Sequence, residues 1–260
     1  MKKKMPEDDI ITNLYKKGKS CREIGELLNI SPSYASKIIK LYGISRKCGN
    51  IKKYKYNNSY FENIDTEEKA YILGYLYADG CVYYRKKGNH EEKSLSLKCS
   101  KNDKEILEFI IKELESNHKI SEDSNGYIGF KIYDNKIFDD LVKHGCIPNK
   151  TCKLKFPTFL REDLIRHFIR GYFDGDGCIC YQKFGLESNE EFLIELQKHL
   201  PVNSKTIPKR TRDGLSYNLT IGGIIQIKKI YNYIYKDAII VLHRKHDKFV
   251  KELNSKIQRA

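Results

Sequence analysis

The chain contains one nine-residue motif twice, as ILGYLYADG at residues 72–80 and as IRGYFDGDG at residues 169–177. Each copy has an apolar body with a glycine inside it, and each ends in Asp-Gly after a small residue. The two aspartates at these ends, Asp79 and Asp176, are 97 residues apart. A motif repeated at this distance indicates an internal duplication, in which each copy organises one structural repeat.

A lysine follows each motif at a similar distance. Lys150 comes 71 residues after Asp79, and Lys245 comes 69 residues after Asp176. The matched spacing extends the duplication from the motif alone to a larger unit. We therefore predict two related half-sites, each with one carboxylate and one lysine.

The composition restricts the classes of partner. The chain has 260 residues with 48 Lys and Arg against 34 Asp and Glu, and its net charge of +14 predicts nucleic acid rather than a membrane surface as its partner. Residues 1–64 hold 14 basic and 6 acidic residues, so this quarter of the chain supplies +8 of the charge. No apolar run approaches the ~18 residues of a membrane span, and no signal peptide is recognisable. We expect a soluble, cytoplasmic monomer.

Eight cysteines raise the question of disulfides or zinc. The sequence has no CxxC pair, so a zinc ribbon is not indicated. Without a secretion signal, we predict that these cysteines are reduced thiols.

Residues 7–42 have the pattern of a helix-turn-helix. Ser20 with Glu23 predicts a capping box at the start of a second helix, and Ser31 followed by Pro32 predicts the start of a third. The outer face of this third helix keeps polar and basic residues, which are Ser33, Tyr34, Ser36, Lys37 and Lys40. Such a helix suits the major groove of DNA, whereas an ordinary three-helix packing unit is the alternative interpretation.

The next segment, residues 45–64, has neither helical nor strand periodicity and interleaves basic residues with tyrosines. A solvated tether and a basic arm along DNA phosphates are both compatible with this composition. Its tyrosines could pack on sugars or on the protein itself. The candidate DNA-binding residues of the segment are Arg46, Lys52, Lys53 and Lys55.

The rest of the chain has the same order of elements twice, a motif helix, two strands, a helix, a hairpin and a closing helix. Asp65 and Asp103 are expected to cap helices of the first repeat, and a last helix over residues 244–253 has no counterpart there. We predict an α+β protein of two pseudo-symmetric αββαββα repeats, whose two antiparallel sheets each leave one face open. The predicted boundaries are 1–44 for the helix-turn-helix, 45–64 for the basic linker, 65–157 for the first repeat and 158–260 for the second.

Small residues recur at helical spacing within each motif helix. They are Ala70, Gly74 and Ala78 in the first helix and Gly171 and Gly175 in the second. Small residues at i and i+4 clear one face, so that two helix backbones can approach closely. If these faces pack on each other, the helix ends lie side by side and the two motif aspartates meet.

Two carboxylates brought together repel each other unless hard cations lie between them. Mg²⁺ takes one or two carboxylates together with phosphate oxygens and water, so the pair predicts metal-assisted phosphodiester hydrolysis. Lys150 and Lys245 would supply positive charge near the reacting phosphate or order the attacking water. A simple Asp-Gly turn at each position is the alternative.

Both motifs and the αββαββα order resemble the LAGLIDADG homing endonucleases in their single-chain, two-repeat form. The second copy, FIRGYFDGDGCI at residues 168–179, is close to the family pattern, and the resemblance covers residues 65–260. It implies two sheets that form a saddle over double-stranded DNA. It also implies site-specific double-strand cleavage with Mg²⁺ or another divalent cation.

The resemblance further implies a role for each motif end. The residues it assigns to the metal are Asp79, Asp176, Ala78 and Gly175, the last two through their carbonyl oxygens. Lys150 and Lys245 lie in HGCIPNKT and LHRKHDKF, which resemble the segments that carry the family's active-site lysine. The neighbouring His144 and Arg244 receive a supporting role.

The two halves differ in two respects. Tyr77 stands where the second copy has Asp174, and the second hairpin must fit into residues 178–186. The shorter hairpin leaves fewer positions for reading bases, so we expect weaker recognition of that half-site. The basic residues on or beside the predicted hairpins, which we take as candidate DNA contacts, are Arg85, Lys98, Lys131, Lys183, Lys209, Arg210 and Arg212.

Two other functions remain open at this point. A DNA-binding regulator on the same fold would use the helix-turn-helix without catalysis, although a pure binder needs neither the two aspartates nor the two lysines. An intron maturase would bind RNA through the same basic surfaces.

Overall fold

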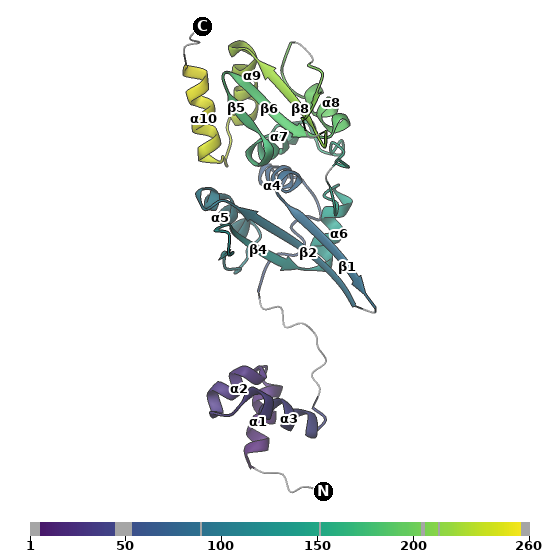
Figure 1. Cartoon of the computed structure of the whole chain (residues 1–260), viewed down its shortest axis with the longest axis vertical. Helices are drawn as coiled ribbons and strands as arrows, with labels where there is room; N and C mark the ends of the chain where they lie inside the picture. The colour runs from purple at the N-terminus through teal and green to yellow at the C-terminus, as the bar shows by residue number, and fades with distance from the viewer. Residues whose placement is uncertain are drawn as a thin grey trace. The chain divides into compact units, whose positions relative to one another are not determined.

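The structure is a computed structural model of the 260-residue chain and describes residues 6–44, 54–88, 90–150, 152–203, 206–212 and 214–255. The chain divides into two compact units, Met1–Lys53 and Tyr54–Ala260 (Figure 1). Within the described ranges, no helix is long and apolar enough to cross a membrane. The seven cysteines in those ranges are free.

The N-terminal unit is a three-helix module. Its helices are α1 (Pro6–Lys16), α2 (Cys21–Leu28) and α3 (Pro32–Leu41). The predicted capping box is confirmed, because the Ser20 side chain accepts a bond from the Glu23 amide while the Glu23 carboxylate accepts one from the Ser20 amide. Ser31 caps α3 as predicted. Local sequence signals therefore account for where both helices begin.

A small core of its own holds this module together. Its buried members are Ile11, Ile24, Ala35, Ile38 and Ile39. The turn between α2 and α3 is tight, because a Cβ on Gly25 would lie 2.7 Å from the carbonyl oxygen of Ile30. The side chains of α3 that do not enter this core remain on its outer face.

The second unit has the predicted αββαββα order twice. The first repeat comprises α4 (Glu67–Ala78), β1 (Cys81–Lys87), β2 (His90–Cys99), the 3₁₀ helix η1 (Lys101–Asp103), α5 (Lys104–Glu113), β3 (Ser121–Glu122), β4 (Ile128–Tyr133) and α6 (Asn135–Lys143). The second repeat comprises α7 (Glu162–Asp176), β5 (Cys178–Cys180), β6 (Lys183–Ser188), α8 (Glu190–Lys198), β7 (Lys209–Arg210), β8 (Tyr217–Gly222), α9 (Ile224–Tyr235) and α10 (His243–Asn254). As predicted, α10 has no counterpart in the first repeat.

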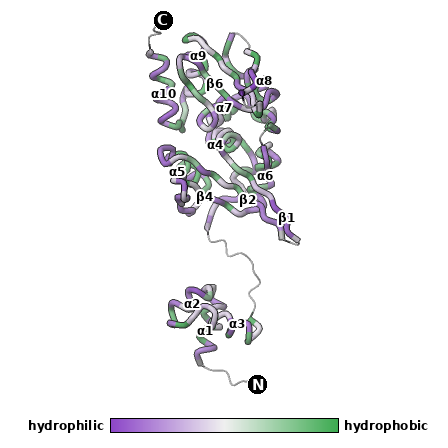
Figure 2. Tube along the Cα trace, in the orientation of Figure 1, coloured by the Kyte–Doolittle hydropathy of each residue, from purple (hydrophilic) through white to green (hydrophobic). Residues whose placement is uncertain are grey.

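Each repeat builds one four-stranded antiparallel sheet. The strand orders, β1-β2-β4-β3 and β5-β6-β8-β7, are equivalent. In the second half of β2, a strand coloured by hydropathy in Figure 2, the buried residues Leu95, Leu97 and Cys99 alternate with the more exposed Ser96 and Lys98. This alternation is the signature of a sheet with one covered and one open face.

The motif helices α4 and α7 pack against each other where the repeats meet (Figure 1). A Cβ on Gly74 would overlap the carbonyl oxygen of Phe168, and a Cβ on Gly171 would overlap that of Tyr71. The two glycines therefore permit a backbone-to-backbone crossing that no larger residue allows. The prediction from small-residue spacing is confirmed.

Two predicted helix caps are wrong. Thr66, not Asp65, caps α4 by accepting a hydrogen bond from the Lys69 amide, and Asp65 instead pairs with the Lys69 ammonium at 2.7 Å. Asp103 precedes α5 but makes no side-chain cap bond. Its carboxylate is instead bound by Arg244 from the other repeat.

Part of the segment expected as a linker packs on the first repeat. Tyr60 is buried and donates a hydrogen bond to Glu113, and Phe61 is fully buried. The ring of Tyr54 stacks on His118 at 4.0 Å between ring centroids, and Tyr56 bonds to Asp134. Of the two options for these tyrosines, the structure thus shows packing on the protein.

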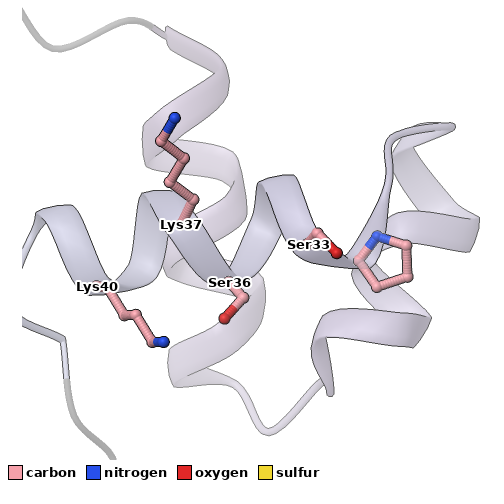
Figure 3. Close-up of a pocket in the computed structure, with 5 residues that line it drawn as sticks. Ser33, Ser36, Lys37 and Lys40 are labelled. Carbon is pink, nitrogen blue, oxygen red and sulfur yellow. The ribbon is translucent and has the colours of Figure 1, made fainter.

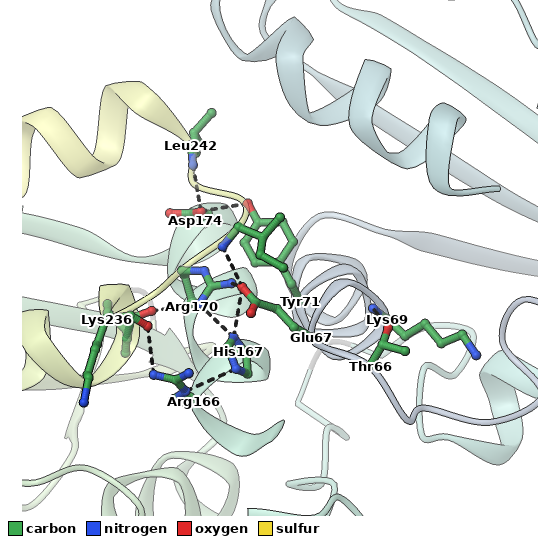
Figure 4. Close-up of polar contacts among 12 residues, drawn as sticks. Thr66, Glu67, Lys69, Tyr71, Arg166, His167, Arg170, Asp174, Lys236 and Leu242 are labelled. Atoms are coloured by element: carbon green, nitrogen blue, oxygen red, sulfur yellow. Dashed lines mark hydrogen bonds and ion pairs between the residues drawn. The ribbon is translucent and has the colours of Figure 1, made fainter. Parts of the chain in front are cut away.

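A buried polar network joins the motif helices (Figure 4). Arg170 of α7 is fully buried and binds Glu67 of α4 at 2.7 Å, with His167 beside both of them. Tyr71 of α4 donates a 2.7 Å hydrogen bond to Asp174 of α7. The residues at the symmetry-related positions do not form the same pairs, so the two motif helices differ in their polar contacts.

Candidate active site and DNA-binding surfaces

The ends of the crossed helices bring the two motif aspartates into one region. Asp79 is the C-cap residue that directly follows α4, and Asp176 is the last residue of α7. A Cβ on Gly175 would lie 3.5 Å from the Asp79 carboxylate oxygen Oδ2, so that carboxylate lies against the residue that precedes Asp176. Both aspartates keep solvent-exposed surface, although their carboxyl groups are partly withdrawn from water among the neighbouring side chains. The crossing of the helices therefore brings the two motif ends together, as the small-residue spacing predicts.

The two lysines reach the same helix ends from outside the motifs. The Lys150 ammonium donates to the carbonyl oxygen of Leu76 at 2.9 Å and to that of Ala78. The Lys245 ammonium donates to the carbonyl oxygens of Phe173 and Gly177. Because helix C-termini carry unpaired carbonyl groups and partial negative charge, each lysine stabilises the end of one motif helix.

The ionisable groups of this region perturb one another. Burial, followed by the charge of Asp79, raises the pKa of Asp176 to about 6. Burial also raises the pKa of Asp79, opposed by a hydrogen bond from Tyr75 and by both lysines. The pKa of Lys150 is lowered by burial, and that of Lys245 is lowered by burial and then by Arg244. Burial therefore disfavours the charged form of both aspartates, and the positive charges of Lys150 and Lys245 offset part of this effect.

This set of donors fits a hard divalent cation. Carboxylate and carbonyl oxygens are the ligands that Mg²⁺ prefers, and it needs few protein ligands when phosphate and water complete its shell. No group of three or more His, Cys, Asp and Glu side chains suited to a metal occurs in the described ranges. A cation here would therefore rely on the two motif aspartates and on carbonyl groups. One such candidate, the Ala78 carbonyl, accepts the Lys150 ammonium in this structure.

The open face of the first sheet carries three of the predicted DNA contacts. The pairing of Arg85 with Glu92, Lys98 with Gly129 and Lys131 with Ser96 places all three basic side chains opposite the buried face. Two tyrosines accompany them on this face. The Lys131 ammonium lies 4.4 Å from the ring centroid of Tyr133 and 5.5 Å from that of Tyr83. The face therefore combines basic and aromatic side chains, with Lys98 paired to Asp123 and Lys131 paired to Glu92 in this structure.

The second sheet offers a smaller open face. Its strand β5 has 3 residues and β6 has 6, against 7 in β1 and 10 in β2. Lys183 and Lys209 lie on the open face, paired with Gly222 and Asn218. Arg210 pairs with Tyr217 and so belongs to the opposite face, whereas Arg212 is exposed in the β7–β8 turn. The second hairpin is shorter than the first, as expected, while weaker recognition of its half-site stays a prediction.

The outer face of α3 has the predicted character. A pocket of ≈ 510 Å³ opens on it (Figure 3), and its lining residues are Pro32, Ser33, Ser36, Lys37 and Lys40. Tyr34 is also exposed on this helix. Polar and cationic groups on one open helix face match what phosphate and base contacts require.

The predicted contacts of the linker are only partly described. Arg46, Lys52 and Lys53 lie outside the described residues. Lys55 is exposed, and its backbone amide donates a 2.7 Å hydrogen bond to the side chain of Asn117.

Sequence reasoning missed an acidic pair in the first repeat. Asp103 binds Arg244 through two hydrogen bonds of 2.8 Å, and Glu105 binds the backbone and ring of His243. His144, expected to support Lys150, is buried and bonded through its ring to the Phe61 carbonyl at 2.8 Å. The only sequence signal of these acidic partners was the presence of two basic residues, His243 and Arg244, directly before Lys245.

Comparisons with known proteins support the fold. Neither a protein-family model nor a curated protein matches the sequence. Among solved structures, the meganuclease I-AabMI bound to uncleaved DNA has a TM-score of 0.52 at 12% identity, over 71% of this chain and 89% of that one. I-DmoI in complex with DNA and Mn has a TM-score of 0.51 at 18% identity, over 65% and 97%. I-LtrWI bound to target DNA has a TM-score of 0.50 at 15% identity, over 75% and 90%.

These identities are low, so the likeness establishes the fold alone. The chain has the fold of the LAGLIDADG homing endonucleases, and the resemblance predicted from the two motifs is confirmed at that level.

Proposed function

We propose that this protein is a site-specific endonuclease that cleaves both strands of double-stranded DNA with a divalent cation. The observation that carries the proposal is the presence of an aspartate and a lysine at the end of each crossed motif helix. A scaffold that only folds or only binds DNA has no need for two carboxylates side by side. The solved proteins with this fold include ones bound to DNA, and one of them holds Mn.

The motif aspartates would hold the cations, with the carbonyl groups of Ala78 and Gly175 as further oxygen ligands. When bound, Mg²⁺ or a similar ion supplies an activated water and stabilises the leaving oxygen. Asp79 and Asp176 are suited to this because a cation between them removes their mutual repulsion. Both ligands project from rigid helix ends, which fixes their separation.

The two lysines are proposed to act on the reacting phosphate. Each ammonium is largely withdrawn from bulk water, and this burial lowers its pKa. Hydrogen bonds to carbonyl groups hold each ammonium at the end of a motif helix. A fixed positive charge in a site of reduced polarity stabilises negative charge that develops on phosphate oxygens more strongly than the same charge in water. Two lysines and two aspartates provide one set of groups for each DNA strand.

The open faces of the two sheets are the proposed DNA-binding surface. Basic side chains there would neutralise phosphates and read base edges, and the net charge of +14 favours association with DNA. The larger first sheet is expected to contribute more base contacts than the second. A single chain already contains both repeats, so we propose that it acts as a monomer.

The N-terminal module is proposed as a second DNA-binding element, with α3 in a major groove. In this proposal residues 1–44 form the module, and 65–157 and 158–260 are the two repeats. Of the predicted link over 45–64, residues 54–64 pack with the first repeat. Such a module would extend the target or direct the protein to its own gene. A regulator without catalysis is the competing function, and α3 is the feature that favours it.

The proposal is tested by finding a site and asking whether it is cut. Duplexes that the full chain binds are selected from a randomised DNA library, and the enriched sequence is placed in a plasmid. We expect a discrete double-strand cut in the presence of Mg²⁺ and none with a chelator. Tight binding without a cut under Mg²⁺ or Mn²⁺ would favour the regulator, and binding to RNA alone would favour the maturase.

A further inference from the structure

The connection between α9 and α10 ties the second repeat to the first. The backbone amide of Ile239 donates to Glu67 of α4 at 2.9 Å, and that of Leu242 donates to Asp174 of α7 at 3.1 Å. Leu242 is fully buried. The chain that leads into α10 is thus fixed to both motif helices before the helix begins.

The first turn of α10 is then bound by acidic side chains of the first repeat. The carboxylate of Asp103 accepts two hydrogen bonds of 2.8 Å from the Arg244 guanidinium, and the carboxylate of Glu105 accepts one of 2.9 Å from the His243 amide. Asp103 is almost fully buried. Two parallel bonds from one guanidinium to one carboxylate fix orientation as well as distance.

These contacts compensate for a helix start that lacks its own stabilising groups. Leu242, the N-cap residue just before α10, makes no side-chain hydrogen bond to the helix, and the first turn contains no acidic residue. It instead places Arg244 and Lys245 at the positive end of the helix, which is unfavourable. Negative charge from Asp103 and Glu105 offsets this and satisfies an amide that would otherwise lack a partner.

Lys245 directly follows Arg244, so its backbone belongs to the helical turn that these contacts hold. Lys245 is 8% exposed, and its ammonium donates to carbonyl groups at the end of α7. The equivalent Lys150 is held differently, in an irregular segment of its own repeat. There the hydroxyl of Tyr77 donates to the His144 carbonyl at 2.6 Å, and the thiol of Cys146 bonds to Leu76.

We infer that Asp103 and Glu105 of the first repeat are positioning residues for Lys245 of the second. The inference rests on the proposed function for its consequence in cleavage, although the positioning itself can be measured without it. One lysine is therefore placed by its own repeat and the other across the repeat boundary. Loss of the acidic pair is therefore expected to displace Lys245 and to leave the placement of Lys150 unchanged.

The positioning is tested first by chemical labelling of lysine amines, followed by mass spectrometry of peptides. In Asp103→Asn/Glu105→Gln we expect Lys245 to be acetylated at least about 5-fold faster than in the unmodified protein. The reason is that a helix without its cap contacts opens more often at that end. Lys150 in the same sample should label at an unchanged rate. Arg244→Lys, which leaves the first repeat untouched, should give the same pattern.

A matched control is available on the same helix. Glu108→Gln removes a carboxylate from α5 that pairs with Lys104 at 2.7 Å on the helix surface. We expect labelling of both lysines to remain unchanged in this variant. Unchanged labelling of Lys245 in the double variant would overturn the inference, as would equal acceleration at Lys150, which reports general unfolding.

The consequence for cleavage is measured strand by strand on a plasmid carrying the selected site. In Asp103→Asn/Glu105→Gln we expect cleavage of one strand to slow on the order of 10- to 100-fold, because small displacements of a positioned group cost that much. The other strand should be cut at its normal rate, so nicked circles accumulate. Equal slowing of both strands would contradict the inference. If the unmodified protein does not cut, the proposed function fails, whereas the labelling result still decides the positioning.

Discussion

At the scale of single residues, two glycines determine how closely the repeats meet. Gly74 and Gly171 lie where each motif helix touches the backbone of the other, and the hypothetical Cβ atoms would also lie 2.9 Å from the amide nitrogens of Tyr172 and Tyr75. The aspartates at the ends of the same helices depend on this crossing for their proximity. Adding a single methyl group at Gly74 or Gly171 is therefore expected to lower stability and also to separate the two aspartates of the proposed site.

Gly74→Ala should destabilise the protein despite the better helix propensity of alanine. Separation of the two backbones costs at least about 2 kcal/mol, as for other overpacked interiors. This corresponds to a fall in Tm of roughly 4–8 °C for a domain of this size, measured by thermal unfolding. Gly222→Ala is the matched control, because its Cβ would only touch Lys183 Cγ at 3.6 Å. Equal stability of the two variants would show that the crossing is loose.

At the scale of elements, the helix pair is held by polar groups that differ between its two members. Glu67, Arg170 and His167 form one cluster, and Tyr71 with Asp174 forms another. Buried ionic groups of this kind add little net stability, but they disfavour arrangements that leave them unpaired. When α4 packs against α7, Glu67 of α4 pairs with Arg170 of α7. If two copies of α7 packed against each other, two Arg170 side chains would meet without the Glu67 carboxylate.

His167 gives this cluster a pH dependence. Burial, and then the charge of Arg170, lowers its pKa to about 4, and Arg166 also donates to its ring. In the unfolded chain His167 becomes protonated near pH 6.5, whereas in the folded chain it stays neutral down to about pH 4. Protonation therefore favours the unfolded chain, and stability should fall as the pH falls from about 6.5 to about 4. His167→Gln should make the stability curve shallower across this window, by at most about 1.4 kcal/mol per pH unit. Denaturant unfolding at several pH values checks this, and parallel curves for both proteins would contradict it.

The role of α3 is tested through the salt dependence of DNA binding. Lys37→Ala/Lys40→Ala should weaken binding to the selected site and reduce the slope of log affinity against log salt by about 2, one counterion for each lysine lost. Lys19→Ala/Arg22→Ala is the control, because these two cations lie at or just before the start of α2 and outside α3. The same loss of slope in both variants would mean that α3 is not the contacting element.

At the scale of the whole molecule, the chain is divided into units with separate cores. The core of the N-terminal module and the core of residues 54–260 share no residue. Residues 54–64 belong with the second unit, since Tyr60 and Phe61 are buried in its core. The two units are therefore expected to fold independently.

A truncated chain of residues 54–260 should unfold within about 2 °C of the main transition of the full chain, since no core contact is removed. It should bind the selected site at least ~10-fold more weakly, because a second linked DNA contact raises overall affinity. Calorimetry and a binding titration measure the two effects. A truncated chain that fails to fold would show that the first unit stabilises the second.

Sequence patterns predicted the features that depend on local signals or on a repeated motif. The capping box at Ser20, the crossing at Gly74 and Gly171 and the order of elements all follow from short-range spacing. Asp103 was misjudged because an aspartate before a helix usually caps it, whereas here a guanidinium 141 residues away binds its carboxylate. The difference between Tyr77 and Asp174 was visible in the sequence, but the partner of Asp174, Tyr71, became apparent only once the helices were packed.

The central claim, that the paired aspartates hold cations for DNA cleavage, is tested most directly by Asp176→Asn. The variant keeps the size of the side chain and removes the charge, so the account predicts loss of Mg²⁺-dependent cutting of the selected site with binding retained. Asp79→Asn should behave in the same way. A variant that still cuts at the normal rate would contradict the assignment of these two aspartates as the catalytic centre.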